Sequence, residues 1–327
     1  MGTHHKLESL DDLITMTNNY ITGRKRKKPS EERTPFNVDL ENISYCAESL
    51  AKLNGLIGMK DIKKNIIDQI LFYGQGLNTN EMMHTCLSGQ PGTGKTSLAK
   101  ILAEVYCSLG FLKTDNIRIV GRSDLIAGYV GQTAIKTMKV LNESKGGVLF
   151  IDEAYSLGVG EDEKGGSFGK ECIDTINKFL SENTEDFILI IAGYKEDLER
   201  YFFGINKGLR RRFPWNYEIS NYSKEDLMQI FIHQVVTNRW RFDISITLNN
   251  YSLLNEIFEK YSDIFVNNGG DTLILFDKAK ICHSRRVFGL KKILKKYLNI
   301  TDIKLAAELM KSNIKQEKEV LPFGMYV

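Results

Sequence analysis

The sequence lacks the features that mark secreted, membrane-spanning and metal-cluster proteins. It contains no run of about 18 apolar residues, so no transmembrane helix and no membrane partner are expected. Residues Met1–Leu10 have no apolar signal core, which predicts that the chain is not secreted. The five cysteines are scattered and form no C-x-x-C pair, which argues against a zinc cluster or a disulfide framework. These absences predict a reducing, cytoplasmic location.

Charge of one sign is not in excess either, because 44 cations face 41 acids and the formal net charge is +3. Such a balance does not by itself predict a nucleic-acid-binding protein. The local exception is the run of cations Arg24–Lys28, which is followed by Pro29. We therefore expect residues 1–45 to form a flexible basic N-terminal arm. The same run is a candidate nuclear-localisation or anion-binding patch.

The rest of the chain predicts an α/β domain followed by a smaller helical domain. Apolar segments alternate with helical stretches between residues 46 and 220, and these segments read HTCLSG, NIRIV, GGVLFID, DFILIIAG and WNYEIS. Strands that alternate with helices form a parallel sheet covered on both faces. Amphipathic helices dominate residues 221–315, where Ser223 is a plausible N-cap, and predict an all-helical lid domain. Residues 316–327 are expected to form a C-terminal tail.

The segment GQPGTGKT follows the first of these strands and precedes a helical pattern. It matches G-x-x-x-x-G-K-[ST], the phosphate-binding loop of P-loop NTPases, in the strand–loop–helix context that this loop requires. Glycines let the backbone curl around phosphates, and amides at the helix N-terminus point at the anion. We predict that Lys95 reaches the β- and γ-phosphates of ATP and that the Thr96 hydroxyl ligates Mg²⁺. The predicted nucleotide contacts in this loop are Gly89, Gln90, Pro91, Gly92, Thr93, Gly94, Lys95, Thr96 and Ser97. The alternative is a glycine-rich turn that binds no ligand.

Two adjacent acids end the strand segment GGVLFIDEAY. The carboxyl ends of parallel strands form the edge at which open α/β sheets bind ligands. We expect Asp152 to hold the magnesium shell and Glu153 to orient or deprotonate the attacking water. The alternative is a solvated acidic strand end without a catalytic role.

Three consecutive arginines occur in GLRRRF, residues 208–213. One use for such a cluster is an arginine finger that completes the site of a neighbouring subunit and stabilises charge on the γ-phosphate. The alternative is a basic surface patch, or salt bridges to acids such as Glu196 and Glu199.

A loop in mid-chain, GYVGQT, offers Tyr129 and Val130 to solvent between two glycines. An exposed aromatic residue of this kind predicts a contact with a partner. The alternative is that Tyr129 folds back onto its own domain, as most aromatic residues in loops do.

Taken together, these motifs resemble the AAA+ ATPases, and more narrowly the CbbX/SpoVK branch. The segments LNGLIGMKDIK, GQPGTGKTSLAKILA, GYVGQTAIKT, GGVLFIDEAYSL, IIAGYKEDLERYF and GLRRRFPW occur in the order of that branch, and the resemblance covers Leu53–Phe288. The phosphate loop is generic, whereas DEAYSL and AGY are much more specific to the branch. Similar proteins occur in large DNA viruses, and KICHSRRVF is similar to their sequences, so a viral origin would place the protein in host cytoplasm.

The resemblance implies a homo-oligomeric ring, usually a hexamer, with ATP bound between subunits. It implies that Arg212 is the first candidate for the arginine finger and Arg210 the second. Leu56, Ile57 and Gly58 match the segment that contacts adenine in the family. Tyr129 and Val130 match the aromatic–hydrophobic–glycine pore loop that grips an extended polypeptide.

Two departures from the family pattern concern the residues that sense nucleotide. Many relatives place an asparagine at the end of the strand that here reads ILIIAGYK, and this chain offers Tyr194 and Lys195 instead. Relatives also carry an arginine at the start of the third lid helix, where this chain has Gly270 and Leu273. Arg285 or Arg286, later on the same helix, are the candidate substitutes.

We expect an ATP-driven remodeller that threads a client protein through a ring pore, although no segment identifies the client. The alternative is a nucleic-acid motor or loader, which would use Arg24–Lys28 and the cations Lys291, Lys292, Lys295 and Lys296. A third hypothesis, a P-loop kinase acting on a small molecule, leaves DEAY and GLRRRF without a role.

Overall fold

The structure is a computed structural model, and it describes residues 10–24, 40–75, 77, 82–129, 131–159, 168–183, 186–248, 251–290 and 295–319. The chain divides into two compact units. The first comprises Met1–Gly89 and Lys95–Ile219, and the second comprises Gln90–Gly94 and Ser220–Val327. The division after Ile219 is adjacent to the predicted domain boundary. None of the helices in the described ranges combines the length and apolar character needed to cross a bilayer.

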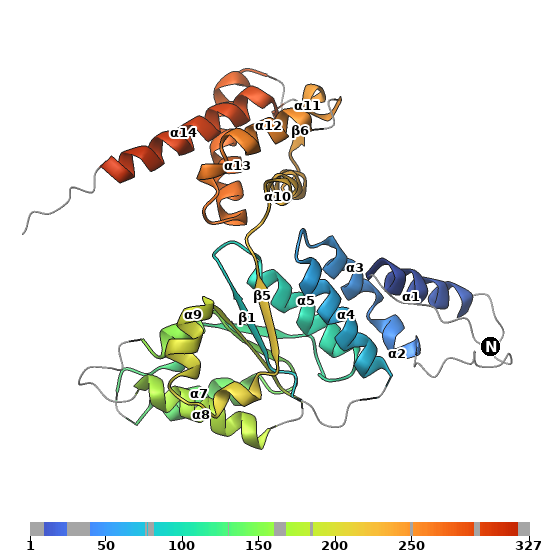
Figure 1. The fold of residues 1–327 in the computed structure, drawn as a ribbon, viewed down its shortest axis with the longest axis vertical. Helices are drawn as coiled ribbons and strands as arrows, with labels where there is room; N and C mark the ends of the chain where they lie inside the picture. Colours follow the sequence, from blue (N-terminus) through green and yellow to red (C-terminus); the bar gives the residue numbers. More distant parts are fainter. Residues whose placement is uncertain are drawn as a thin grey trace, which may run out of the picture. The chain divides into compact units, whose positions relative to one another are not determined.

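The first unit is built on one parallel sheet, as the sequence predicts (Figure 1). Its strands run in the order β2-β3-β4-β1-β5, and every neighbouring pair is parallel. Each of the five apolar segments contains one strand: β1 (Thr85–Gly89), β2 (Ile117–Val120), β3 (Val148–Ile151), β4 (Ile188–Gly193) and β5 (Trp215–Ile219). Because β1 lies next to β4, two segments that are far apart in the sequence bring their carboxyl ends together.

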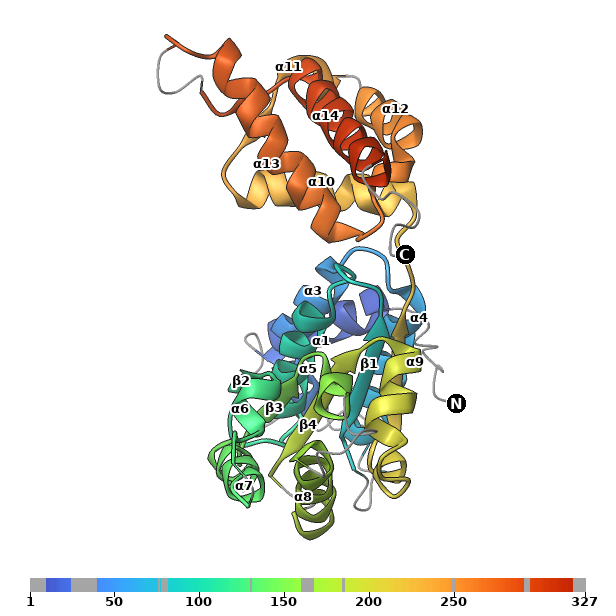
Figure 2. The same cartoon turned by 90° about the vertical axis from the view of Figure 1, so that its left-hand side faces the viewer.

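Helices cover both faces of this sheet (Figure 2). Val148 and Phe150 of β3 pack into one core cluster, whereas Leu149 and Ile151 pack into the other, as expected for a strand buried on both sides. The first cluster is covered by α1 (Leu10–Arg24), α2 (Leu40–Tyr45), α3 (Ala47–Gly55), α4 (Lys60–Gly74) and α5 (Lys95–Ser108). The second is covered by α6 (Arg122–Leu125), α7 (Thr133–Glu143), α8 (Phe168–Glu182), α9 (Lys195–Leu198) and the short turns η1 (Ala154–Leu157), η2 (Glu199–Phe203) and η3 (Leu209–Arg212).

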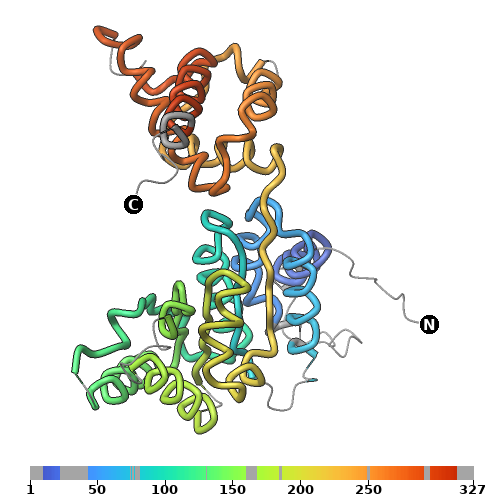
Figure 3. Tube along the Cα trace, turned by 60° about the vertical axis from the view of Figure 1, so that its left-hand side comes forward, coloured from blue at the N-terminus to red at the C-terminus, as the bar shows by residue number. Residues whose placement is uncertain are grey.

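The prediction of a flexible arm over residues 1–45 is wrong for α1 and α2. Leu10, Leu13 and Thr17 are buried at helical spacing, and Leu13 belongs to the same core cluster as α3 and α4. Asn54 of α3 donates to Asp11 at 2.8 Å. Figure 3 traces α1 beside these helices. Four of the five cations in the run Arg24–Lys28 lie outside the described residues.

The second unit is a helical bundle of α10 (Lys224–Thr237), α11 (Ile244–Leu248), α12 (Ser252–Lys260), α13 (Gly269–Arg286) and α14 (Ile300–Glu319), with a single turn η4 (Ser262–Ile264). Ser223 caps α10 by accepting from the Asp226 N–H at 3.1 Å, as expected. A two-residue parallel pair, β6 (Arg241–Phe242) with β7 (Tyr297–Leu298), departs from the all-helical expectation. Helix α14 continues to Glu319, so the predicted tail from residue 316 is wrong for its first four residues, and residues 320–327 lie outside the described ranges.

Candidate active site

The phosphate loop joins β1 to α5 in the context that the motif requires. Gly92 and Gly94 have φ values of 69° and 90°, which is the left-handed region that glycine enters without strain. The Thr93 hydroxyl donates to the Gln90 carbonyl at 2.8 Å and closes the turn. Lys95 is the first residue of α5, so the loop ends at the N-terminus of a 14-residue helix, a position suited to anions.

The tip of the loop, Gln90–Gly94, is held by residues of the second unit. Tyr222 donates its hydroxyl to the Thr93 carbonyl at 2.8 Å, and the Gly269 N–H donates to the Gly92 carbonyl at 3.1 Å. The Asn268 side chain donates to the Pro91 carbonyl at 3.3 Å. These bonds use carbonyl groups of the loop, whereas phosphate is bound by its N–H groups. Sequence reasoning missed Tyr222 and Asn268, because single polar residues far from the motif carry no local signal.

Lys95 lies at the centre of the predicted chemistry in the first unit. Its side chain is buried, its Nζ donates to the Gly89 carbonyl at 2.9 Å, and the same atom lies 5.9 Å from the ring centre of Tyr194. Burial lowers the pKa of Lys95, and the charges of Glu153 and Asp152 oppose that shift. The structure therefore brings the predicted lysine, the two acids and one sensor candidate into one neighbourhood.

Asp152 and Glu153 follow the carboxyl end of β3, as predicted. The Asp152 N–H donates to the Val120 carbonyl at 3.2 Å, which continues the β2–β3 ladder by one residue. Glu153 has φ 50° and ψ 45°, a left-handed conformation that is rare outside glycine and asparagine. Burial raises the pKa of Glu153, the charge of Asp152 raises it further, and Lys95 acts in the opposite direction. A raised pKa suits a general base, because a carboxylate with a higher pKa is a stronger base.

The candidate magnesium ligands are one carboxylate, Asp152, and one hydroxyl, Thr96. No group of three or more His, Cys, Asp or Glu side chains suited to a metal occurs in the described part of the chain. This set fits Mg²⁺, which usually binds proteins through one or two side chains and completes its shell with phosphate oxygens and water.

The two candidates for the first sensor are placed differently. The Tyr194 ring lies 5.7 Å from the ring of Tyr155, in addition to its contact with Lys95. Lys195 instead binds Glu218 at 2.5 Å and is exposed. Tyr194 is thus the candidate that borders the Lys95 site, a distinction that the sequence alone does not make between adjacent residues. Tyr155 was not predicted as a site residue.

Leu56, Ile57 and Gly58 form the bend between α3 and α4. All three are half-buried, and Leu56 closes α3 by donating its N–H to the Leu53 carbonyl at 3.2 Å. Gly58 adopts φ 70°, which the sharp bend requires. Their contact with adenine stays a prediction.

The three arginines of η3 have different surroundings. Arg210 forms a 3.2 Å salt bridge to Glu199, one of the acids named in the salt-bridge alternative, and donates to the Asn216 amide oxygen at 3.0 Å. Arg212 donates from Nη2 to the Ser181 hydroxyl at 2.8 Å, and its Nε is buried without a hydrogen-bond partner among the described residues. Arg211 is exposed.

The loop around Tyr129 is held at its base and open at its tip. Thr133 accepts from the Ala127 N–H at 3.2 Å, and Thr137 donates its hydroxyl to the Leu125 carbonyl at 3.0 Å. Lys136 donates to the Ile126 carbonyl at 3.0 Å. The Tyr129 side chain is 74% exposed, so it does not fold back onto its own unit. Val130 lies outside the described residues.

Arg285 and Arg286 lie in the last turn of α13, which places them about 24 Å along the helix axis from Gly269. Gly269 and Gly270, at the start of α13, lie against Gly92 of the phosphate loop, so the two arginines are at the opposite end of the helix from that contact. The Arg286 guanidinium is also bound to Asp302, with Nη2 and the carboxylate oxygen 2.9 Å apart. This arrangement does not favour a sensor role for either residue.

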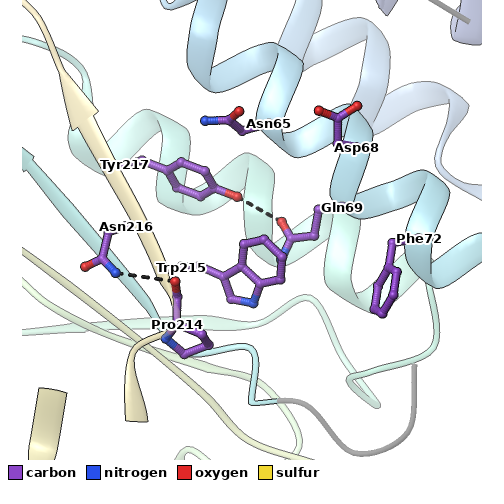
Figure 4. A pocket seen from close by; sticks show the side chains of 8 residues that line it. All are labelled: Asn65, Asp68, Gln69, Phe72, Pro214, Trp215, Asn216 and Tyr217. Carbon is purple, nitrogen blue, oxygen red and sulfur yellow. Dashed lines mark hydrogen bonds between the residues drawn. The ribbon is translucent and has the colours of Figure 1, made fainter. Parts of the chain in front are cut away.

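A groove beside β5 has no predicted site residue in its lining, although Arg210 donates to Asn216 at its edge (Figure 4). It has a volume of about 340 Å³ and is lined by Asn65, Asp68, Gln69, Phe72, Pro214, Trp215, Asn216 and Tyr217. Within it, Tyr217 donates to the Gln69 side chain at 2.9 Å.

Comparison with known proteins agrees with this geometry. Residues 85–220 match the family model described as "ATPase family associated with various cellular activities (AAA)". The chain is 38% identical over 271 residues to the putative cfxQ-like protein R730 of Acanthamoeba polyphaga mimivirus, which covers 82% of this chain and 65% of that protein. It is 37% identical to stage V sporulation protein K of Bacillus subtilis, over 55% of this chain and 57% of that protein. It is 36% identical to the plasmid-encoded protein CbxX of Cupriavidus necator, over 61% of this chain and 65% of that protein. The matched region therefore spans less than two thirds of each of these relatives.

Solved structures show the same fold at low sequence identity. The FIGL-1 AAA domain, solved with ADP, superposes with a TM-score of 0.55 at 19% identity, over 81% of this chain and 89% of that one. A mutant RuvB of Thermotoga maritima superposes with a TM-score of 0.53 at 18% identity, over 79% and 72%. The fold, the family model and the relatives confirm the resemblance drawn from the motifs. Residues 85–220 are an AAA-family ATPase domain, and the relatives of the chain include a CfxQ-like protein, a CbxX protein and stage V sporulation protein K.

Proposed function

We propose that this chain forms a homo-oligomeric ring, a hexamer, that hydrolyses ATP with Mg²⁺. We propose further that the ring uses the Tyr129 loop to pull a client protein. Support comes from the placement of an exposed tyrosine loop in the same unit as the lysine and the two acids. That observation carries the proposal, because the 74% exposed tyrosine lies in the segment that resembles the pore loop of the family, where an aromatic side chain grips an extended polypeptide.

In the proposed reaction, the backbone N–H groups of the phosphate loop bind the phosphates and Lys95 leaves the Gly89 carbonyl to reach the γ-phosphate. Asp152 and Thr96 would hold Mg²⁺, which supplies charge neutralisation at the phosphates. Glu153 orients a water for in-line attack and accepts its proton. Tyr194, whose ring centre lies 5.9 Å from the Lys95 Nζ, would contact the γ-phosphate end of the nucleotide.

The site is completed, in this proposal, by an arginine from the neighbouring copy. Arg212 would have to give up its hydrogen bond to Ser181, a net cost of about 1 kcal/mol. We expect Arg212→Ala to bind ATP but to hydrolyse it at least about 100-fold more slowly, since arginine fingers contribute factors of that order or more. Arg211→Ala is the matched control. A large loss in Arg211→Ala together with full activity in Arg212→Ala would move the finger to Arg211.

The threading role is tested at Tyr129. Tyr129→Phe keeps the aromatic grip, whereas Tyr129→Ala removes it, so we expect only the second to lose remodelling of a client. The client is first captured with Glu153→Gln plus ATP, a variant that binds nucleotide and traps the loaded state. Client unfolding and ATP turnover are then measured together in both Tyr129 variants. Equal remodelling by Tyr129→Ala and Tyr129→Phe would refute threading.

A nucleic-acid motor remains the second candidate function. The observation that favours it is the group of exposed cations near the end of α13, which includes Arg285, Lys295 and Lys296. Stimulation of ATP turnover by DNA, with affinity that falls steeply as salt rises, would support this candidate over the first. No stimulation at low salt would exclude it.

A further inference from the structure

Arg122 joins two parts of the first unit that the proposed function uses separately. It is the first residue of α6, directly after β2. Its Nη1 donates to the carbonyl oxygens of Ser156 and Leu157, the second at 2.8 Å. These carbonyls end the turn η1, which begins directly after Glu153. Carbonyl groups at the end of a helical turn have no partner within the turn, so a cation placed there satisfies them.

The turn η1 is also fixed on its other sides. The Ser156 N–H donates to the Glu153 carbonyl at 2.8 Å. Leu157 is fully buried, and Gly158 lies so close to η2 that a Cβ there would clash with the Tyr201 carbonyl oxygen. A turn held this closely shifts as one piece, and Glu153, in its left-handed conformation, shifts with it.

On the side away from η1, helix α6 and the residues after it connect Arg122 to the exposed Tyr129. Helix α6 is capped by the Gly121 N–H, which donates to the Asp124 carboxylate at 2.8 Å, and it ends at Leu125. The bonds from Thr137 and Lys136 of α7 described above then fix the carbonyls at the end of α6 and just beyond it. Tyr129 follows only four positions after the last residue of α6. These contacts connect Arg122 to the base of the loop.

We propose that Arg122 is a positioning residue that makes the catalytic turn and the tyrosine loop move together. This inference rests on the proposed roles of Glu153 and Tyr129. The two bonds from the guanidinium to the Ser156 and Leu157 carbonyls are the link on which the coupling depends. When Glu153 adjusts to ATP, the guanidinium transfers the movement of η1 to α6, and in the reverse direction a load on the loop reaches Glu153.

The experiment uses the full chain with Trp215→Phe and Trp240→Phe and with the reporter substitution Tyr129→Trp, so that the emission comes from position 129. Tryptophan emission is measured after mixing with ATP and with ADP. We expect a difference in emission between the two nucleotides. Adding Arg122→Ala should abolish that difference and lower ATP turnover by at least about tenfold, the effect of losing one charged hydrogen bond. Nucleotide affinity, measured by titration with ADP, should stay within about threefold because the hydrogen bonds of Arg122 go to the carbonyls of η1.

Two further variants separate coupling from folding. Arg122→Lys keeps the charge and can make only part of the bonding, so it should restore part of the emission difference. Arg118→Ala removes a neighbouring guanidinium that binds Glu143 on the surface, and it should leave the response unchanged. Two results would overturn the proposal. The first is a full emission difference in Arg122→Ala, or in Arg122→Lys if the alanine variant does not fold. The second is the absence of any emission difference between nucleotides in the Tyr129→Trp parent. No client is needed, so failure of the threading function would be recognised separately.

Discussion

Burial of His84 should make the stability of the first unit depend on pH. It immediately precedes β1, is 1% exposed, and accepts at Nδ1 from the Leu189 N–H at 3.1 Å. Its Nε2 therefore carries the proton of the neutral ring, and this atom is buried without a hydrogen-bond partner among the described residues. Burial lowers the pKa of His84 to about 3, and the charge of Arg212 contributes to the shift.

The sign and size of the effect follow from the two pKa values. An unfolded histidine has a pKa of about 6.5, so below that pH the unfolded chain binds a proton that the folded chain does not. The contribution of His84 to stability is complete above pH of about 6.5 and is lost as the pH falls toward 3. Between about pH 7.5 and about pH 5.0 the expected loss in the free energy of unfolding is about 2 kcal/mol.

The assay is urea unfolding at several pH values in a Trp240→Phe background, so that fluorescence reports Trp215 of the first unit. His84→Asn keeps an acceptor for the Leu189 N–H but does not titrate. Between about pH 7.5 and about pH 5.0, the free energy of unfolding of this variant should therefore fall by about 2 kcal/mol less than that of the parent. The exposed residue His233 provides the control, and His233→Asn should follow the parent curve. Parallel curves for the parent and His84→Asn would refute the reasoning, because every other titrating group is common to both.

Three further predictions concern the site and its packing. The midpoint of the acid side of the pH profile for ATP turnover should lie above the ordinary glutamate pKa of about 4.3, because the pKa of Glu153 is raised. Glu153→Gln should bind ATP but turn it over at least about 100-fold more slowly. If the residual activity of Glu153→Gln shows the same acid side, another group is the base. Lys95→Ala should lower nucleotide affinity in an ADP titration by at least about tenfold, through loss of a charged contact to phosphate, and unchanged affinity would contradict the assigned role. Gly158→Ala should lower the free energy of unfolding by about 1–3 kcal/mol or more, because its Cβ would meet the Tyr201 carbonyl, whereas Gly128→Ala, with open space around it, should melt like the parent.

The sheet and the reaction centre could be predicted because their signals are local. Each strand is a short apolar run, and the phosphate loop and the acid pair are contiguous motifs at strand ends. Because parallel strands end at one edge of the sheet, Lys95 after β1 and Glu153 after β3 share that edge, although β4 lies between the two strands. The N-terminal helix α1 escaped prediction because its buried residues are sparse in a polar segment next to a run of cations, and tertiary packing of Leu13 decides its structure.

The remaining site features depend on contacts between distant residues. Tyr194 and Lys195 are adjacent in sequence, and only the side-chain directions at the end of β4 place one beside Lys95 and the other on Glu218. Arg122 binds carbonyls 34 and 35 residues away, and backbone carbonyls have no signature in sequence. The lid contacts of the phosphate loop come through Tyr222 and Asn268, which are ordinary polar residues by composition.

The left-handed backbone at Glu153 creates a conflict between ATP hydrolysis and thermal stability. A glutamate in this region costs about 1–3 kcal/mol relative to a relaxed conformation, and asparagine tolerates it better. An asparagine at this position would raise the melting temperature while removing the carboxylate that we propose activates water. Consensus design or directed evolution that screens only for thermostability would thus select against the working enzyme at this codon, and any such campaign must hold it fixed.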